Sequence, residues 1–127
     1  MNRCGRLKIL VIDRDTDLVH SLARILRLEG YAVDEAAHAP EAVTLAAANE
    51  PDIVILDALR PDRVGIHRRL RQICHQAAFL MTVGTEPDLQ NLRSRGLTVI
   101  RKPFEIDQLL TTLETLGRRP SDVCLAS

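Results

Sequence analysis

The sequence predicts an α/β fold of the doubly wound type, in which helices cover both faces of a five-stranded parallel sheet. Short apolar runs alternate along the chain with segments whose apolar residues recur at helical spacing. Runs such as Ile53–Leu56 are apolar without interruption, as expected of parallel strands buried on both faces. The 127 residues are enough for one domain, and its core must be aliphatic because only 2% of them are aromatic.

The elements follow one another in order. Thr16 or Asp17 can cap the first helix, Gly30 fits the position after its end, and Pro40 fits the first turn of the second helix. The predicted strands are Leu7–Ile12, Tyr31–Val33, Ile53–Leu56, Ala78–Met81 and Leu97–Ile100; a loop is expected at Glu35–Ala39, and the helices are about Thr16–Glu29, Pro40–Asn49, Ile66–Ile73, Pro87–Arg95 and Glu105–Leu116.

No linker or repeat divides the chain, so a single domain over residues 1–127 is expected. Its core spans about residues 7–117, and residues 118–127 have no periodicity, which indicates a mobile tail or the start of a linker. The formal net charge is zero, which gives no basic field for nucleic acid. No apolar stretch is long enough to span a bilayer and no signal peptide precedes the first strand, so a cytoplasmic protein without a membrane partner is expected.

The cysteines and the arginines indicate which kinds of site and partner to expect. Cys4, Cys74 and Cys124 are odd in number and contain no C-x-x-C pair, which argues against disulfides and a zinc site. The third helix has a basic outer face, which is interpreted as solvated, with an anionic partner as the alternative. That face consists of Arg63, Arg68, Arg69 and Arg71.

Polar side chains follow four of the predicted strands, at Asp13 to Asp15, Asp57, Thr82 and Lys102. The carboxyl ends of parallel strands share one edge of the sheet, where ligands bind in such folds. Clustered carboxylates favour a hard cation such as Mg²⁺, and a carboxylate beside it can form an aspartyl phosphate. A lysine and a hydroxyl group can balance the charge of the transferred phosphoryl group. The alternative is a set of unrelated, solvated strand ends.

From about Lys8 to Leu116 the sequence resembles the receiver domains of two-component response regulators. The resemblance is carried by LVIDRD at the first strand, EGYAV around the second, PDIVILD with Pro61 and Gly65, LMT at the fourth strand, and KPF at the end of the fifth. It implies the flavodoxin-like (βα)5 fold. It also implies a phosphorelay protein that is not an enzyme, beyond catalysing its own phosphorylation and dephosphorylation.

The resemblance also implies roles for individual residues. Asp57 matches the phosphoacceptor, and Thr82 and Lys102 match the residues that contact the phosphoryl group. Asp13, Asp57 and the backbone carbonyl of Leu59 match the Mg²⁺ ligands, and the Lys102–Pro103 peptide matches a cis bond. The implied partners are a sensor histidine kinase or phosphotransfer protein and an output domain or partner protein, with a possible homodimer through the 87–116 face.

Several positions depart from the family pattern. Arg14 replaces the second acid, which normally binds the metal, and predicts weak or absent Mg²⁺ binding and an ion pair with Asp57 instead. Val83 replaces a small residue and is expected to restrict access to the site, and Val64 replaces an acid. Val99 replaces the switch aromatic, which predicts a fixed output surface. A phosphorylation-competent receiver and a degenerate pseudo-receiver therefore both remain open.

The alternative from another class is a small phosphohydrolase of the haloacid-dehalogenase type, with Asp13 as nucleophile in a D-x-D motif. Against it, Asp17 stands where threonine or valine is expected, and no late acidic pair follows a strand. A dinucleotide site is disfavoured because acids replace the glycine-rich turn after the first strand. Direct DNA binding is disfavoured because no helix-turn-helix segment remains once the elements are assigned.

Overall fold

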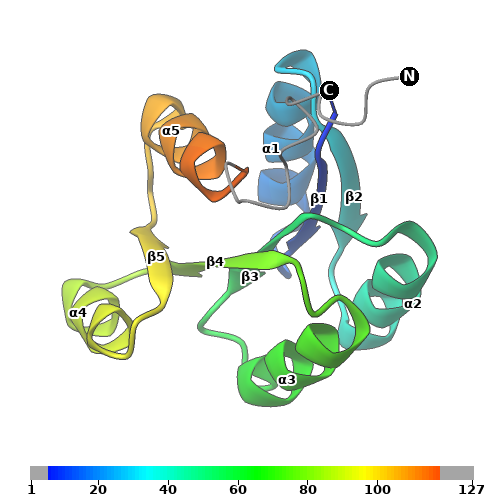
Figure 1. The fold of residues 1–127 in the computed structure, drawn as a ribbon. Helices are drawn as coiled ribbons and strands as arrows, with labels where there is room; N and C mark the ends of the chain where they lie inside the picture. The colour runs from blue at the N-terminus through cyan, green and yellow to red at the C-terminus, as the bar shows by residue number, and fades with distance from the viewer. Residues whose placement is uncertain (1–5, 118–127) are drawn as a thin grey trace.

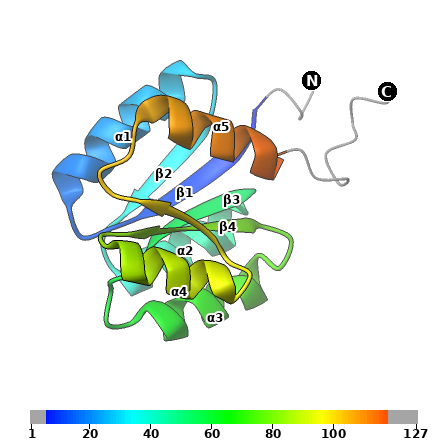
Figure 2. The ribbon, with the colours of Figure 1, turned by 90° about the vertical axis from the view of Figure 1, so that its left-hand side faces the viewer.

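The computed structural model describes residues 6–117, and in it five parallel strands form one sheet in the order β2-β1-β3-β4-β5. Helices α1 and α5 cover one face, and α2, α3 and α4 cover the other (Figures 1 and 2). The predicted doubly wound fold is confirmed. The elements are β1 Lys8–Ile12, α1 Thr16–Leu28, β2 Ala32–Ala36, α2 Ala39–Asn49, β3 Ile53–Asp57, α3 Arg63–Ile73, β4 Ala78–Val83, α4 Glu86–Ser94, β5 Thr98–Arg101 and α5 Ile106–Gly117. The expected tail at 118–127, Cys4 and Cys124 lie outside the described residues.

Alternate residues of each central strand enter two separate cores. In β1, Ile9 and Val11 pack beneath α1 and α5, whereas Leu10 and Ile12 pack beneath α2, α3 and α4. This explains the uninterrupted apolar runs, because a strand with helices on both faces has no side exposed to water. All four side chains are essentially inaccessible, and each such burial contributes about 1.5–3 kcal/mol to folding.

The element boundaries differ from the predictions in ways that matter for the site. Asp15, rather than Thr16 or Asp17, caps α1, and its side chain accepts a hydrogen bond from the Leu18 N–H at 3.1 Å. β2 continues to Ala36, so the first two residues of the predicted loop at Glu35–Ala39 are strand and only residues 37 and 38 separate β2 from α2. A polar residue fits in β2 because this strand is at the edge of the sheet. α3 begins three residues earlier than predicted, at Arg63, since a first helical turn at the surface needs no apolar residue.

Two helix ends follow the sequence signals. Gly30 has φ +102° directly after α1, a left-handed conformation that glycine adopts without steric cost, as predicted. Pro40 lies in the first turn of α2, where its missing N–H is not needed. Within residues 6–117, no helix combines the length and apolar character required to cross a membrane.

Candidate functional site

The sheet order places the carboxyl ends of β1 and β3 next to each other at the point where the chain changes direction. From β1 the chain passes by α1 to β2 on one side, and β3 pairs with β1 on the other. Crevices that bind ligands in open α/β sheets form at this kind of switch point. Asp13 directly follows β1 and Asp57 is the last residue of β3, so both carboxylates lie at this crevice.

Lys102 follows β5, the edge strand opposite β2, and its side chain reaches both carboxylates. Its Nζ lies 2.6 Å from Asp13 Oδ2 and 3.8 Å from Asp57 Oδ1. The backbone N–H of Lys102 donates to the Val83 carbonyl at 2.6 Å, which fixes the residue directly after β5. The Lys102–Pro103 peptide is cis, as the resemblance predicted. Asp13 is only 6% exposed, so its attraction to the ammonium is weakly screened by solvent.

The two carboxylates have different hydrogen-bond partners. Asp13 uses both oxygens, because Oδ1 accepts from the Asp15 N–H at 3.0 Å while Oδ2 meets Lys102. Asp57 accepts from the Leu59 N–H at 3.1 Å through Oδ1. Its Oδ2 has no hydrogen bond to any part of the chain within residues 6–117. The carboxylate that matches the phosphoacceptor therefore keeps one oxygen available for reaction.

Thr82 lies beside Asp57 in the sheet, as its register partner on β4. Thr82 is only 3% exposed, and its Oγ1 has no hydrogen-bond partner among residues 6–117. An unpaired buried hydroxyl costs free energy, so its presence calls for a ligand or a functional role. Thr82 also lines a narrow cavity together with Asp13 and Lys102. The four residues singled out from the sequence thus meet at one place.

Arg14 does not form the contact that the sequence predicted. It is exposed, and in the described part of the chain it makes no ion pair with Asp57, whose cationic partner is Lys102. Asp15 caps α1 immediately after it, and this turn leads the Arg14 side chain to the surface. Its charge contributes instead to lowering the pKa of Asp62, as a minor cause. The predicted Arg14–Asp57 ion pair was wrong.

The three valines that depart from the family pattern have different environments. Val83 is fully buried in the core beneath α2, α3 and α4, on the opposite face from the cavity that Thr82 lines, so the expected obstruction of the site is not observed. Val99 is 6% exposed and belongs to the same core. Val64 lies at the surface and is 56% exposed, as is Leu59 in the loop that follows Asp57.

Sequence reasoning missed Arg60, whose side chain is almost completely buried in the loop after β3. Its Nε and Nη2 donate to the two carboxylate oxygens of Asp62 at 2.9 and 3.1 Å, and its Nη1 donates to the Ala37 carbonyl at 2.8 Å. The hydrogen bond from Arg60 lowers the pKa of Asp62. Arg60 therefore ties the loop after Asp57 to the loop after β2. Only the nearby Asp62 could have signalled this in the sequence, since an arginine between a leucine and a proline looks solvated.

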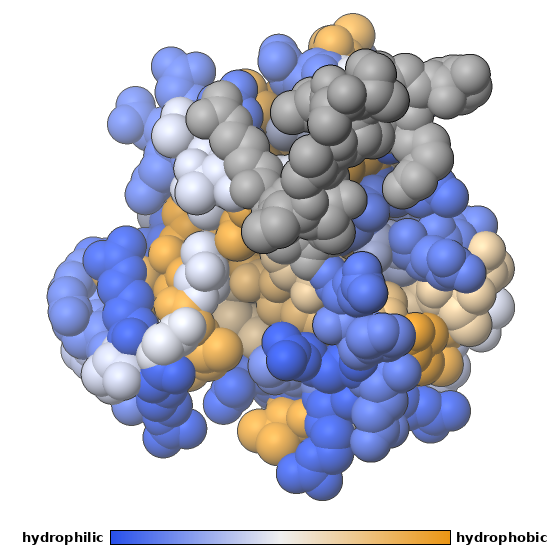
Figure 3. Space-filling model, in the orientation of Figure 1, coloured by the Kyte–Doolittle hydropathy of each residue, from blue (hydrophilic) through white to orange (hydrophobic). Residues whose placement is uncertain are grey.

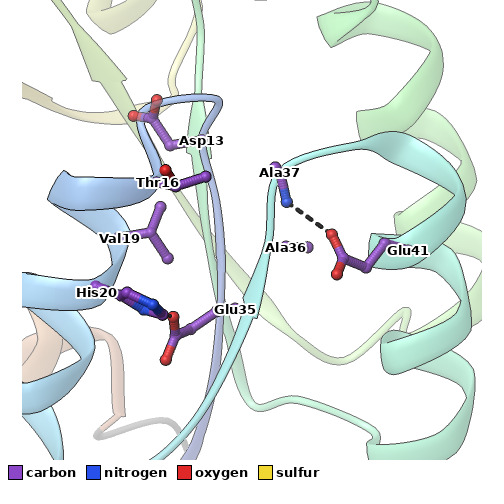
Figure 4. A pocket seen from close by; sticks show the side chains of 8 residues that line it. All are labelled: Asp13, Thr16, Val19, His20, Glu35, Ala36, Ala37 and Glu41. Atoms are coloured by element: carbon purple, nitrogen blue, oxygen red, sulfur yellow. Dashed lines mark hydrogen bonds and ion pairs between the residues drawn. The ribbon is translucent and has the colours of Figure 1, made fainter.

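A pocket of about 270 Å³ opens between α1 and β2, with Asp13 at one end (Figure 4). Two other acids line it, and both have partners: Glu35 contacts His20 and Arg27, and Glu41 accepts from the Ala37 N–H at 2.9 Å. Across residues 6–117, no three histidine, cysteine or acidic side chains are arranged to hold a metal ion.

The sequence matches the family described as response regulator receiver domain over residues 9–114. It is 35% identical over 122 residues to the response regulator MprA of Mycobacterium sp. (strain KMS), an alignment that covers 91% of this chain and 52% of that protein. The MprA of Mycolicibacterium vanbaalenii is 34% identical over 120 residues, covering 89% of this chain and 51% of the relative. The chain spans about half the length of the curated relatives it matches.

Solved structures give the same result. The receiver domain of the hybrid histidine kinase CckA superposes with a TM-score of 0.72 at 29% identity, covering 87% of this chain and 99% of that one. The non-phosphorylated receiver domain of HemR from Leptospira biflexa gives a TM-score of 0.73 at 26% identity, covering 90% and 98%.

Proposed function

The chain belongs to the response regulator receiver domain family, and we propose that Asp57 is the residue on which it accepts a phosphoryl group. It is thus a receiver domain of the two-component type. The observation that carries the assignment of Asp57 is the position of the Lys102 ammonium between the carboxylates of Asp13 and Asp57, beside the unpartnered Thr82 hydroxyl. This supports a site that binds a further anionic group through one cation and one hydroxyl donor.

The chemistry follows from these positions. Asp57 Oδ2 attacks the phosphorus of the donor, the bond from phosphorus to the leaving group breaks, and the electron pair departs with that group. An aspartyl phosphate remains on Asp57. Lys102 balances the negative charge on the phosphoryl oxygens, and the Thr82 hydroxyl donates a hydrogen bond to one of them. Lys102 can do so while it still contacts Asp13, whose second oxygen is held by the backbone.

Receiver domains generally bind Mg²⁺ for phosphorylation. In this chain the donor set fits the ion poorly, because both oxygens of Asp13 are engaged and Arg14 supplies a guanidinium where the family has an acid. The remaining ligands would be Asp57 and the Leu59 carbonyl, fewer than the usual carboxylate set. We therefore propose that Lys102 supplies the positive charge at this site and that Mg²⁺ contributes little.

The family relationship supports the remaining parts of the proposal. The phosphoryl donor would be a sensor histidine kinase or a phosphotransfer protein, and the effect would pass to an output domain or partner protein. The receiver family is not a conventional enzyme family. The phosphohydrolase alternative with Asp13 as nucleophile has no support, since neither oxygen of Asp13 is free. We propose one domain for residues 1–127 and a docking or dimer face at residues 87–116.

The proposed docking face at residues 87–116 departs from the family pattern at Val99. Val99 on β5 is buried in the core and carries no ring that could turn between a buried and an exposed position. We propose that the face around Val99 has the same shape before and after phosphorylation.

Incubation of the chain with acetyl phosphate and Mg²⁺, followed by intact mass spectrometry, tests the assignment of Asp57. A single phosphoryl adduct is expected on the wild-type chain and none on Asp57→Asn. An equal adduct on Asp57→Asn, or none on either chain, would overturn it.

A further inference from the structure

A hollow lies between α2 and α3, away from the site just described. Its volume is about 560 Å³, and Pro40 and Val43 of α2 face Gly65 and Ile66 of α3 across it. Arg69 lies at its edge. In Figure 3, hydrophobic surface on the α2 side borders the hydrophilic surface of α3. We call this hollow the α2–α3 groove.

Gly65 keeps the groove open on the α3 side. A Cβ built at this position would meet no atom within 4 Å. Its backbone lies outside the left-handed region in which glycine is required, so the absence of a side chain is not explained by backbone conformation. A side chain placed here would enter the groove rather than the core, which makes the position a useful test.

The charge on α3, beside the groove, is entirely basic. The sequence of α3, RVGIHRRLRQI, contains four arginines and no acid. Arg68, Arg69 and Arg71 are exposed, and in residues 6–117 none of them forms an ion pair. Arg27 pairs with Glu35 and Arg101 with Glu86, whereas Arg24, Arg93 and Arg95 form no ion pair within residues 6–117; α3 differs from α1 and α4 in containing no acid. Arg69 lines the groove and Arg68 is its neighbour on α3, so cations without an ion pair in the described part of the chain border apolar side chains and favour an acidic partner.

We propose that the α2–α3 groove docks an acidic segment of a partner protein that inserts an apolar side chain between Val43 and Ile66 while its carboxylates meet Arg68 and Arg69. A nucleic acid fits less well. Its affinity comes from many phosphate contacts, and here most of the lining is apolar and Arg69 is the one basic residue among the described residues in it. The formal net charge of zero also provides no wider positive field.

This inference is independent of phosphorylation at Asp57. The groove shares no lining residue with the Asp13, Asp57, Thr82 and Lys102 site, and it lies outside the 87–116 face. The same chain would therefore carry a second docking surface, which remains active in the Asp57→Asn variant.

The test uses the full chain and a synthetic amidated peptide that presents leucine and glutamate at helical spacing. Backbone amide NMR spectra locate the contact, and fluorescence anisotropy gives the affinity. We compare a peptide with lysine in place of glutamate, a polyglutamate peptide without leucine, and an oligothymidylate.

The variants are Arg68→Glu with Arg69→Glu, and Gly65→Leu. The matched control is Arg6→Glu with Arg24→Glu, two exposed arginines outside both the groove and the 87–116 face that change the net charge equally. Circular dichroism verifies that each variant is folded.

The expected result is that the leucine–glutamate peptide shifts resonances of α2 and α3. The Arg68/Arg69 variant and Gly65→Leu should each weaken binding by about tenfold or more, as lost ion pairs and a blocked groove require, while the Arg6/Arg24 control changes it little. The proposal is overturned by equal weakening in the Arg6/Arg24 control, by tighter binding of the oligothymidylate, or by shifts outside α2 and α3. Self-association of the chain in sedimentation that the Arg68/Arg69 variant abolishes would also overturn it, in favour of a second copy.

Discussion

The ammonium of Lys102 lies 2.6 Å from the carboxylate of Asp13, although 89 positions separate the two residues in sequence. The same ammonium reaches Asp57 at 3.8 Å. One lysine therefore holds together two carboxylates that would otherwise repel each other at the ends of neighbouring strands. This contact links the stability of the fold to the chemistry of the site.

Replacing Lys102 by methionine should lower the free energy of unfolding by about 2 kcal/mol, because it leaves the nearly buried Asp13 without its partner. It should also slow formation of the phosphoryl adduct. Urea denaturation and intact mass spectrometry measure the two effects. Lys8→Met is the control, since Lys8 is the exposed first residue of β1. Unchanged stability of Lys102→Met would contradict the role of this contact.

Replacing Thr82 by valine should separate function from stability. The hydroxyl is buried without a partner within the described residues, so its removal should raise the free energy of unfolding by about 1 kcal/mol. Contacts to a phosphoryl group should be lost at the same time. Denaturation measures the change in the free energy of unfolding, and the lifetime of the phosphoryl adduct reports on the lost contacts. Thr98→Val, at an exposed position of β5, should change neither. A less stable Thr82→Val would show that the hydroxyl is satisfied in the folded chain.

Arg60→Leu should destabilise the chain by about 2 kcal/mol, because the Ala37 carbonyl loses its donor and the loop after β3 is no longer tied to the loop after β2. The pKa of Asp62 should rise toward its ordinary value once the Arg60 hydrogen bond is removed. Denaturation and an NMR titration of Asp62 measure both effects. Arg68→Leu, on the exposed side of α3, should have little effect on either. An unchanged pKa in Arg60→Leu would contradict the assigned pairing.

Because of His67, the free energy of unfolding should decrease as the pH falls below neutrality. Burial, with the positive charges of Arg71 and Arg63, lowers the pKa of His67 below its usual 6.5. The unfolded chain therefore binds this proton more readily than the folded one, so the contribution of neutral His67 is present above about pH 6.5 and is lost as the pH falls through the lower folded value. His67→Phe, which preserves a ring against Phe79, should reduce this loss in denaturation measured from pH 7 to 5. The exposed His75→Gln serves as control. Parallel pH profiles for His67→Phe and wild type would contradict the assignment.

The fold and the meeting of the four site residues followed from local patterns. Continuous apolar runs identified strands with helices on both faces, and parallel strands bring their carboxyl ends to one edge. Asp13, Asp57, Thr82 and Lys102 could therefore be grouped from the sequence alone. The details that were missed depend on side-chain direction. The turn at Asp15 leads Arg14 to the surface, and alternation along β4 directs Val83 into the core instead of toward the site.

Arg60 shows a second limit of sequence reasoning. Arginine is rarely buried unless it is paired, and its pairing here needs the Ala37 carbonyl from a loop that lies 23 positions earlier in the chain. No local pattern indicates such a contact. The ends of elements also followed less directly from the sequence, because the first turn of α3 lies at the surface and the polar residues Asp34 and Glu35 belong to β2.

The most direct test of the account is the Mg²⁺ dependence of phosphorylation at Asp57. The initial rate of adduct formation from acetyl phosphate is measured by intact mass with Mg²⁺ and with EDTA, on the wild-type chain and on Arg14→Asp, which restores the acid of the family. Because Lys102 supplies the positive charge, the two wild-type rates should agree within about threefold, whereas Mg²⁺ should accelerate Arg14→Asp by about tenfold or more. Formation of the wild-type adduct only in the presence of Mg²⁺ would contradict the account.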